Sequence, residues 1–339
     1  MKSFFKKSYR WAIVFTLLLI CSVAFVMLDT YLIPKSYQAV VSKASTQTDV
    51  NTSQTTTGTD TTQTITDASS AINSDTSTDV TSDNTSDTTT DTQSSSEAVI
   101  TDNSYVDDNI KISIETAREY DSNVYIADIQ LTEASYLKTA LAGNTYGRNI
   151  KAATSEMASD NNAIFAINGD FYGFRNNGYV LRNGVLYRDK AGDNEALTID
   201  NDGNFSVIDE SKVSLDSLDL NTIWQILSFG PGLIIDGKIV VDGTSEVSQS
   251  MNSNPRTAIG QISPLHYIVI VSDGRTEESA GLSLLNLAQV FADRGCTTAY
   301  NLDGGGSATM YFNGNIVNIP TDGRSFGERE VSDIVYVGY

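Results

Sequence analysis

The sequence predicts an α+β fold, in which a strand-rich mixed sheet core with two or three flanking helices forms a single globular domain behind an N-terminal membrane anchor. Apolar segments of strand length recur through the C-terminal part of the chain, separated by turns rich in glycine, asparagine and aspartate. Only two segments of that part carry the spacing of an amphipathic helix. A polar stretch of biased composition precedes the domain, and an apolar run precedes that stretch.

The N-terminus has the pattern of a membrane anchor. Residues 1–10 are basic, and residues 11–28 are uncharged and just long enough to span a bilayer as a helix. Cations before this run and Asp29 after it place the N-terminus in the cytoplasm. A cleaved signal peptide is the alternative, although no small-x-small cleavage site follows cleanly. We therefore predict a single-pass protein of the cell membrane with an extracellular C-terminal domain.

Residues 29–106 are predicted to form a disordered extracellular tether. From about Ser42 to Asn103 this segment consists mostly of serine, threonine, aspartate, asparagine and glutamine, with almost no large apolar side chain. Such a composition cannot bury enough surface to offset the entropy of ordering the chain. Glycosylation of its hydroxyl groups and passage through a cell wall are both open roles for it.

Composition excludes several classes of function. The chain has 339 residues and a formal net charge of −20, so nucleic acid is not expected as a partner. Its one histidine, His266, excludes a multi-histidine zinc site. Cys21 lies in the apolar run, which leaves Cys296 alone in the domain without an intrachain disulfide partner. No cofactor is predicted, and a divalent cation stays an open possibility.

The domain itself, residues 107–339, has a suitable size for one folding unit. Alternating or continuous apolar character predicts strands within residues 110–114, 123–131, 163–167, 182–187, 197–207, 228–240, 255–261, 266–271, 298–302, 308–312 and 334–337. Helical spacing predicts helices within residues 150–159 and 282–294, the second capped by Ser283 and closed by Gly295.

One local pattern organises the domain. An apolar run ends at Asp303, passes through Gly304, Gly305 and Gly306, and resumes as strand-like residues 308–312. Three glycines are expected where a Cβ atom would be in the way. A P-loop or dinucleotide fingerprint would require a helix next, so neither fits. A hairpin turn is the structural alternative, whereas a carboxylate beside bare amides is typical of a polar ligand site.

Polar clusters follow three of the predicted strands. These clusters begin at Asn168, Asp273 and Asp303. If the strands neighbour one another and run the same way, their ends form one cleft, because ligand sites collect at such ends. Arg256 and Arg329 precede strand-like runs and are expected at the same rim. Together with the carboxylates Asp303 and Glu277, these groups match what a sugar joined to a phosphate requires.

Other polar residues have simpler explanations. His266 enters a strand without any partner motif and is predicted to be structural. Ser307 lacks a nucleophile elbow, which disfavours a serine hydrolase. Taken alone, Asp273 and Gly274 would be an ordinary turn. Arg256 and Arg275 could each form a surface salt bridge of little energetic weight.

Five segments carry a resemblance to a known family. Asn-Gly-Asp-Phe-Tyr at 168–172 and Asp-Gly-Gly-Gly-Ser at 303–307 occur in order with residues 255–260, 273–277 and 329–332. This order resembles the phosphodiester glycosidase family over most of residues 162–339. The positions that match its pattern are Asn168, Arg256, Asp273, Glu277, Asp303, Gly304, Gly305, Gly306, Ser307 and Arg329. The chain departs from it at Asp170, where glycine is common, and at Arg275, where glutamine occurs.

The resemblance implies a hydrolase that cleaves a sugar-1-phosphodiester, expected in cell-envelope or exopolysaccharide glycans. Asp303 and Glu277 are the predicted catalytic pair, because glycoside cleavage usually needs two carboxyl groups. Arg256 and Arg329, with the glycine amides, are expected to hold the phosphate, and Asn168 to orient sugar hydroxyls. The other predicted substrate-binding residues are Asp273, Arg275 and Ser307. A non-catalytic polysaccharide-binding module is the alternative, and an anchored structural protein would leave the polar strand ends unexplained.

Overall fold

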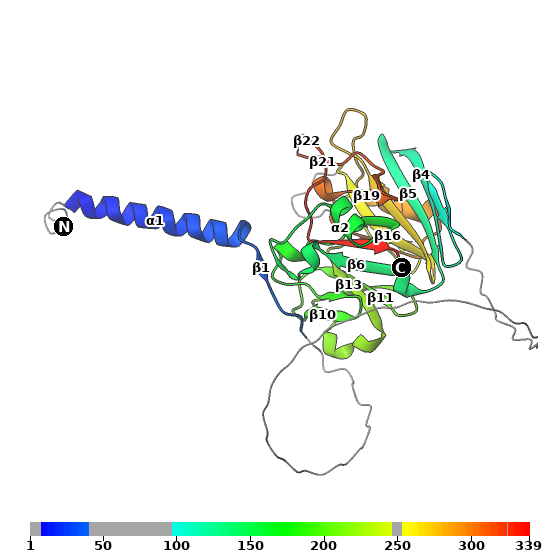
Figure 1. The fold of residues 1–339 in the computed structure, drawn as a ribbon, viewed down its shortest axis with the longest axis horizontal. Helices are drawn as coiled ribbons and strands as arrows, with labels where there is room; N and C mark the ends of the chain where they lie inside the picture. Colours follow the sequence, from blue (N-terminus) through cyan, green and yellow to red (C-terminus); the bar gives the residue numbers. More distant parts are fainter. Residues whose placement is uncertain (1–7, 41–96, 246–252, 324) are drawn as a thin grey trace, which may run out of the picture. The chain divides into compact units, whose positions relative to one another are not determined.

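The computed structural model describes residues 8–40, 97–245, 253–323 and 325–339 (Figure 1). The first seven residues of the predicted basic start and most of the predicted tether, residues 41–96, lie outside the described residues. The cytoplasmic location of the basic start and the disorder of the tether therefore stay predictions.

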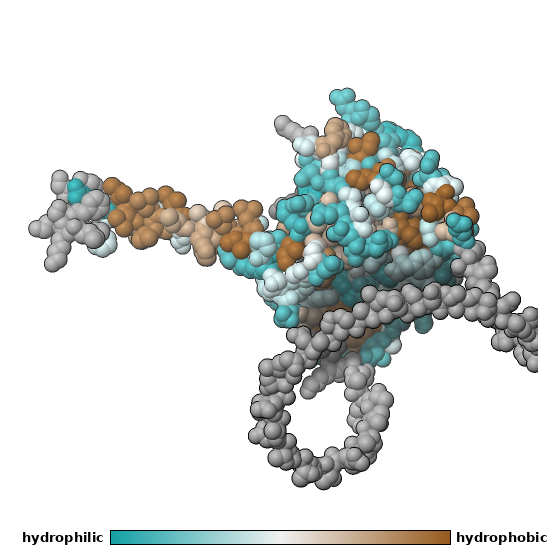
Figure 2. Space-filling model, viewed as in Figure 1, coloured by the Kyte–Doolittle hydropathy of each residue, from teal (hydrophilic) through white to brown (hydrophobic). Residues whose placement is uncertain are grey.

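Helix α1 (Ser8–Tyr31) covers the predicted apolar anchor. Its 24 residues correspond to a length of about 36 Å at 1.5 Å per residue, enough to cross the hydrocarbon core of a bilayer. Residues 10–31 pass the length and composition criteria for a membrane-spanning helix. Figure 2 shows the helix covered by apolar side chains, whereas polar and apolar side chains intermix on the surface of the C-terminal domain.

The domain is built on a nine-stranded sheet with the order β15-β14-β18-β16-β17-β5-β4-β3-β2. Its strands are β2 (Val99–Ile100), β3 (Ser104–Val106), β4 (Ile110–Glu119), β5 (Ser122–Leu131), β14 (Gly232–Ile235), β15 (Lys238–Ile239), β16 (Arg256–Ser263), β17 (His266–Ser272) and β18 (Thr298–Asn301). The sheet begins at β2 and β3, before the expected domain boundary at Asp107.

Two five-stranded sheets complete the strand-rich core, with the orders β10-β9-β13-β11-β12 and β20-β19-β8-β23-β6. The first comprises β9 (Val180–Arg182), β10 (Val185–Arg188), β11 (Glu195–Asp200), β12 (Phe205–Asp209) and β13 (Ile223–Ser228). The second comprises β6 (Leu137–Leu141), β8 (Phe165–Asn168), β19 (Met310–Phe312), β20 (Asn315–Ile316) and β23 (Asp333–Val337). Two short ribbons pair β1 (Lys35–Ser36) with β7 (Gly147–Arg148) and β21 (Thr321–Asp322) with β22 (Ser325–Phe326).

Two helices flank the sheets, as predicted. Helix α3 (Leu284–Asp293) starts at Ser283, whose hydroxyl accepts a hydrogen bond from the Asn286 amide, and Gly295 follows it in the left-handed region with φ of 78°. Its Phe291 ring packs against Gly260 of β16. A Cβ atom on Gly260 would lie only 2.7 Å from this ring, so the position requires a residue without a side chain. Helix α2 (Thr154–Asp160) is shorter than the expected helix and packs on the second five-stranded sheet.

Sheet topology brings the predicted strand ends together. Every strand pairing that the described residues form is antiparallel, and β16 lies between β17 and β18. Strands β17 and β18 therefore run in the same direction, and Ser272 and Asn301 at their ends flank the first residues of β16. The expected meeting is confirmed for the ends of β17 and β18, although β16 separates these two strands. The third predicted strand, β8, belongs to another sheet, and its Asn168 reaches the Asp303 carbonyl through its side chain. This edge carries the candidate site.

Candidate active site

A pocket of about 370 Å³ opens beside the turn that contains Asp303. The residues that line it are Lys151, Asp170, Phe171, Phe174, Asp303, Ser307, Asp322, Arg329, Glu330, Val331 and Ser332. A larger cavity of about 530 Å³ is lined by Asp193, Glu195 and Arg175 among others, but Asp303 and the glycine turn are not part of its wall. The smaller pocket is lined by three of the predicted site residues, Asp303, Ser307 and Arg329, so we take it as the candidate active site.

Asp303 is held in place by β8. The Asn168 side chain donates a hydrogen bond of 2.6 Å to the Asp303 carbonyl, and its own carbonyl accepts one from the Thr257 hydroxyl at 2.8 Å and one from the Thr309 amide at 3.3 Å. Asn168 is fully buried. Through these bonds Asn168 connects two sheets and orients the Asp303 backbone. The sequence predicted instead that Asn168 orients sugar hydroxyls.

Each glycine after Asp303 meets a different packing constraint. A Cβ on Gly304 would lie 2.7 Å from the Pro255 carbonyl, and Gly305 has φ of 62°, a conformation that side-chain-bearing residues rarely adopt. A Cβ on Gly306 would lie 2.8 Å from the Arg329 guanidinium carbon. The Gly305 amide donates to the Pro255 carbonyl at 2.8 Å. It is therefore not available to bind a phosphate, contrary to the prediction from the sequence. A short 3-10 turn and then β19 follow, which confirms that this is no P-loop.

Arg329 forms the basic side of the pocket. Its guanidinium packs over Gly306 and bonds through Nε to Asp322 at 3.0 Å, while its amide donates to the Gly306 carbonyl at 3.1 Å. The preceding Glu328 accepts a hydrogen bond of 3.0 Å from the Ser155 amide in the first turn of α2. The Arg329 side chain is 41% exposed, so it is fixed at its base and still reaches solvent.

The surroundings of Asp303 raise its pKa to about 6. Burial of the carboxylate is the main cause, because desolvation disfavours the charged form. The Ser307 hydroxyl, the Arg329 charge, the Gly304 amide and the Arg175 charge act in the opposite direction. Ser307 Oγ has no hydrogen-bond partner of good geometry within the described part of the chain. A carboxylate that titrates near neutrality, with a hydroxyl group next to it, is a suitable acid–base group.

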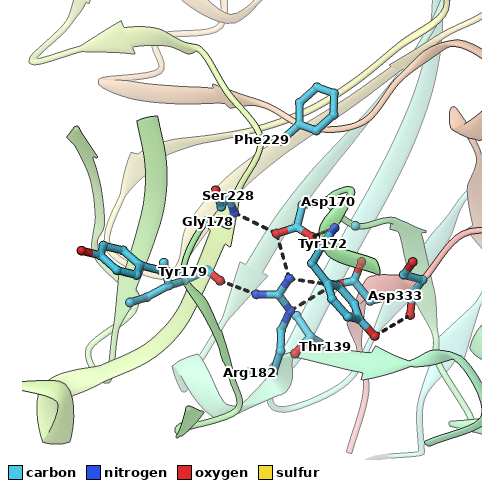
Figure 3. Close-up of polar contacts among 12 residues, drawn as sticks. Thr139, Asp170, Tyr172, Gly178, Tyr179, Arg182, Ser228, Phe229 and Asp333 are labelled. Atoms are coloured by element: carbon cyan, nitrogen blue, oxygen red, sulfur yellow. Dashed lines mark hydrogen bonds and ion pairs between the residues drawn. The ribbon is translucent and has the colours of Figure 1, made fainter. Parts of the chain in front are cut away.

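Beneath the pocket lies a fully buried charge cluster, shown in Figure 3. The Arg182 guanidinium lies between two carboxylates, at 2.8 Å from Asp170 and 2.9 Å from Asp333. Asp170 also accepts hydrogen bonds from the Ser228 and Tyr172 amides, at 2.8 and 2.9 Å. Burial is the main reason that the pKa of Asp333 is raised to about 8. Repulsion by the negative charge of Asp170 adds to the shift, whereas the Arg182 charge opposes it.

Two half-buried aromatic rings form the apolar part of the pocket wall. Phe171 and Phe174 stack with their ring centres 4.7 Å apart and their planes 22° apart. The Arg175 guanidinium lies 5.8 Å from the Phe171 ring centre and 5.0 Å from that of Phe229. An apolar platform next to a carboxylate suits the C–H face of a sugar ring.

Some predicted site residues lie outside this pocket wall. Glu277 is exposed and does not line the pocket, so the structure does not pair it with Asp303. Arg256 is buried, and its Nε donates to the Leu282 carbonyl at 2.9 Å. Arg275 lies against Gly305, and its Nε donates to the Asn254 side chain at 3.2 Å.

Asp273 and His266 have structural roles. The Asp273 carboxylate accepts hydrogen bonds from the Tyr125 hydroxyl at 2.9 Å and the Ile319 amide at 2.8 Å, and burial raises its pKa. It therefore ties β5 to the loop after β20. His266 contacts the Asp128 carboxylate at 3.1 Å, which confirms the structural histidine. Within the described residues, both cysteines are free, and no group of three or more histidine, cysteine, aspartate or glutamate side chains is placed to hold a metal ion.

Sequence reasoning missed much of the pocket wall. Asp170 was judged only as a departure from a family pattern, and Arg182 and Asp333 were not identified at all. The aromatic residues Phe171 and Phe174 directly follow a predicted buried strand, a signal that could have been used. Nothing in the sequence signals that Asp333 contacts Arg182, because the two are 151 positions apart.

Comparison with known proteins agrees with the predicted resemblance. Residues 161–338 match the phosphodiester glycosidase family. The chain is 31% identical over 202 residues to the SPbeta prophage-derived uncharacterized protein YomE of Bacillus subtilis, covering 57% of this chain and 31% of that protein. It is 31% identical over 190 residues to the N-acetylglucosamine-1-phosphodiester alpha-N-acetylglucosaminidase of Mus musculus, covering 51% and 36%. The chain thus spans about a third of the length of these relatives.

Solved structures show the same fold. The zebrafish N-acetylglucosamine-1-phosphodiester alpha-N-acetylglucosaminidase catalytic domain, auto-inhibited by its pro-peptide, superposes with a TM-score of 0.54 at 22% identity, covering 68% of this chain and 83% of that chain. A hypothetical protein from Synechocystis gives 0.51 at 15% identity, covering 68% and 62%. The family match over residues 161–338, which is more than half of the chain, shows that this protein belongs to the phosphodiester glycosidase family.

Proposed function

We propose that this chain is a hydrolase that cleaves the bond between the anomeric carbon of a sugar and an oxygen of a phosphodiester. The observation that carries the proposal is that Asp303, with its pKa near 6, and the half-exposed Arg329 line one pocket. The substrate offers an electrophilic carbon next to a fixed negative charge. The pocket offers a carboxylate for the carbon and a guanidinium for the phosphate.

Arg329 is proposed to bind the departing phosphate. Guanidinium groups bind phosphate oxygens in a bidentate manner, and the partial exposure of Arg329 leaves donors for a ligand. The amide of Gly304, which already lies near the Asp303 carboxylate, adds positive character to the same turn. Phe171 and Phe174 are proposed to support the sugar ring.

Asp303 is proposed to act in its ionised form. A phosphate monoester is already a stable leaving group, so protonation by an acid contributes little and stabilisation of its charge contributes more. The remaining task is to activate water or to stabilise positive charge at the anomeric carbon, and both tasks require a carboxylate. Asp303 is thus the group whose ionisation should limit the rate below pH 6.

Asp170 is proposed as the second acidic group, in place of Glu277. Asp170 lines the pocket, and its carboxylate is fixed by Arg182 and by two backbone amides. A fixed, buried carboxylate favours the positive charge that develops on the sugar in the transition state. Glu277 has no such support, because its side chain is exposed and outside the pocket wall.

The apolar helix α1 is proposed to anchor the enzyme in the cell membrane, with the domain outside and phosphodiester-linked envelope glycans or exopolysaccharide as substrates. The test is to incubate the full chain with a methyl phosphodiester of N-acetylglucosamine 1-phosphate and with phosphodiester-linked wall or capsule polymers. New reducing ends and phosphomonoesters are expected in equal amounts. Saturable binding without any product would instead support a non-catalytic polysaccharide-binding module.

Substitution of Arg329 is expected to change both the rate and the pH profile. Arg329→Gln should lower kcat/KM by about 10²-fold, the effect of removing one charge-stabilising donor. It should also move the acidic limb of the profile to higher pH, because the Arg329 charge lowers the pKa of Asp303. A pH series of kcat/KM for both proteins measures the two effects. A slower enzyme whose limb stays near pH 6 would mean that Arg329 does not act on Asp303.

A further inference from the structure

A further pocket, of about 270 Å³, is lined in part by Tyr172 and has no carboxylate among its lining residues. They are Tyr37, Gln38, Tyr146, Gly147, Arg148, Tyr172, Arg175, Asn176, Tyr187 and Arg188. Three arginines around one small cavity are unexpected in a chain of net charge −20. Arginines that line a cavity without acids are typical of sites for anions.

The three guanidinium groups are held by neutral oxygens alone. Arg188 donates from Nε to the Gly178 carbonyl and from Nη1 to the Tyr172 and Arg175 carbonyls, at 2.5, 3.1 and 2.8 Å. Arg148 donates to the Asn176 side chain at 2.7 Å. None of the three forms an ion pair with any residue that the structure describes. Arg148 and Arg188 therefore have no described acid at ion-pair distance, whereas Arg175 also lines the larger cavity with Asp193 and Glu195 and its charge acts on Asp303.

One donor in this pocket has no partner. Arg148 Nε is buried and makes no hydrogen bond to the described residues. Leaving a buried donor without a partner is unfavourable, and more so when the group is charged, so such groups usually bind something that the protein itself does not supply. The Arg175 guanidinium lies over the Phe171 and Phe229 rings and makes one long hydrogen bond of 3.5 Å, to the Ser228 carbonyl, so it also has donors left for a ligand.

We propose that this pocket, which we call the arginine pocket, binds a phosphate ester. Guanidinium forks match phosphate oxygens, and a cavity of this size admits a phosphate ester more readily than a whole polymer unit. The aromatic rings of Tyr146 and Tyr187, with centres 5.1 Å apart, supply an apolar wall for the ester's organic part. The site adds to the proposed hydrolytic pocket and does not depend on it.

Two sources can supply this chemistry. The neighbouring phosphate of a polymeric substrate is one, because Arg175 lines the arginine pocket and its charge also lowers the pKa of Asp303. A lipid headgroup is the other, because Tyr37 and Gln38 belong to the segment that follows α1. That segment is attached to the domain by pairing of β1 with β7 and by a hydrogen bond of 2.9 Å from the Tyr37 amide to the Tyr146 carbonyl.

The test measures binding of sn-glycerol 3-phosphate by calorimetry to the full chain in phosphatidylcholine nanodiscs. All proteins carry Arg329→Gln, so the candidate active site contributes little, and no turnover is needed. We expect saturable binding that Arg148→Gln weakens about tenfold, the loss of one charge-assisted contact. Arg148→Lys should retain part of it. Arg118→Gln is the matched control, since Arg118 is an exposed arginine that also forms no ion pair with the residues that the structure describes, and it should change nothing.

The proposal is overturned if the Arg329→Gln chain shows no saturable binding, or if Arg148→Gln and Arg118→Gln bind equally well. Thermal unfolding of each variant verifies that the fold is retained. Phosphatidylglycerol mixed into the nanodiscs separates the two sources. If phosphatidylglycerol reduces the binding of glycerol phosphate, and this competition disappears in Arg148→Gln, the ligand is a lipid headgroup. If phosphatidylglycerol leaves the binding of glycerol phosphate undiminished, the ligand is the phosphate of a soluble or polymeric ester. Both results support the site.

Discussion

Asp303→Asn is expected to lower kcat/KM for a sugar-1-phosphodiester by about 10³-fold or more, within the range that a positioned acid–base group supplies. The amide keeps the size and most contacts of the carboxylate but cannot activate water or stabilise positive charge. The residual rate should also lose its acidic limb near pH 6, because the group that titrates there is absent. Steady-state kinetics of both proteins across pH 4.5–8 measures these effects.

Glu277→Gln is the matched control for this experiment. It removes an acid at a position that also fits the family pattern, but one that is exposed and outside the pocket wall. We expect near-native activity. If Glu277→Gln were as inactive as Asp303→Asn, the paired-carboxylate prediction from the sequence would be right and the assignment of Asp170 would be wrong.

Arg182→Met is expected to destabilise the domain by about 3–5 kcal/mol, the cost of removing one partner from a buried ion pair. Arg182 holds the carboxylates of Asp170 and Asp333, and both are fully buried. Methionine fills a similar volume but leaves two acids facing one another without a cation. Urea unfolding at pH 7 measures the loss. Arg294→Met, which breaks the partly exposed pair with Glu115, is the control and should cost less than about 1 kcal/mol.

This loss should depend on pH. In the folded protein the pKa of Asp333 is raised from 3.8 to about 8, so the folded state retains a proton that the unfolded state releases. The contribution of Asp333 to stability is therefore complete below pH 4 and decreases as the pH rises toward 8, by up to about 1.4 kcal/mol per pH unit. Arg182 lowers the pKa of Asp333, so without it Asp333 should hold its proton more strongly. The destabilisation by Arg182→Met is thus expected to be smaller at pH 5 than at pH 8, and the reverse order would contradict this account.

Local pattern was enough to predict most elements of the fold. Strands β4 and β5 and the hairpin of β11 and β12 follow from period-two alternation, and α3 follows from its apolar face and its caps. The sequence also predicted that polar strand ends would meet, because the acids Asp273 and Asp303 come shortly after β17 and β18. Pairing of the strands into three sheets depends on contacts between distant residues, which local pattern does not encode.

The candidate site was predicted less completely, for physical reasons. Asp303, Ser307 and Arg329 were identified because motif and chemistry agree at those positions. Asp273 was assigned to the substrate, whereas its carboxylate is used by Tyr125 and a backbone amide. Whether an acid in such a motif has a structural or a catalytic role depends on the hydrogen-bond donors around it, and those donors come from other strands. The same holds for Asp170, whose role depends on Arg182.

The most direct test of the central claim is to hydrolyse a methyl phosphodiester of N-acetylglucosamine 1-phosphate in ¹⁸O-labelled water and to locate the label by mass spectrometry. A glycosidase breaks the carbon–oxygen bond, so the account predicts ¹⁸O in the released sugar and none in the methyl phosphate. Label in the phosphate would show attack at phosphorus and contradict the assignment of Asp303 to the anomeric carbon. Absence of any product from this diester and from the envelope polymers would contradict the proposed hydrolase itself.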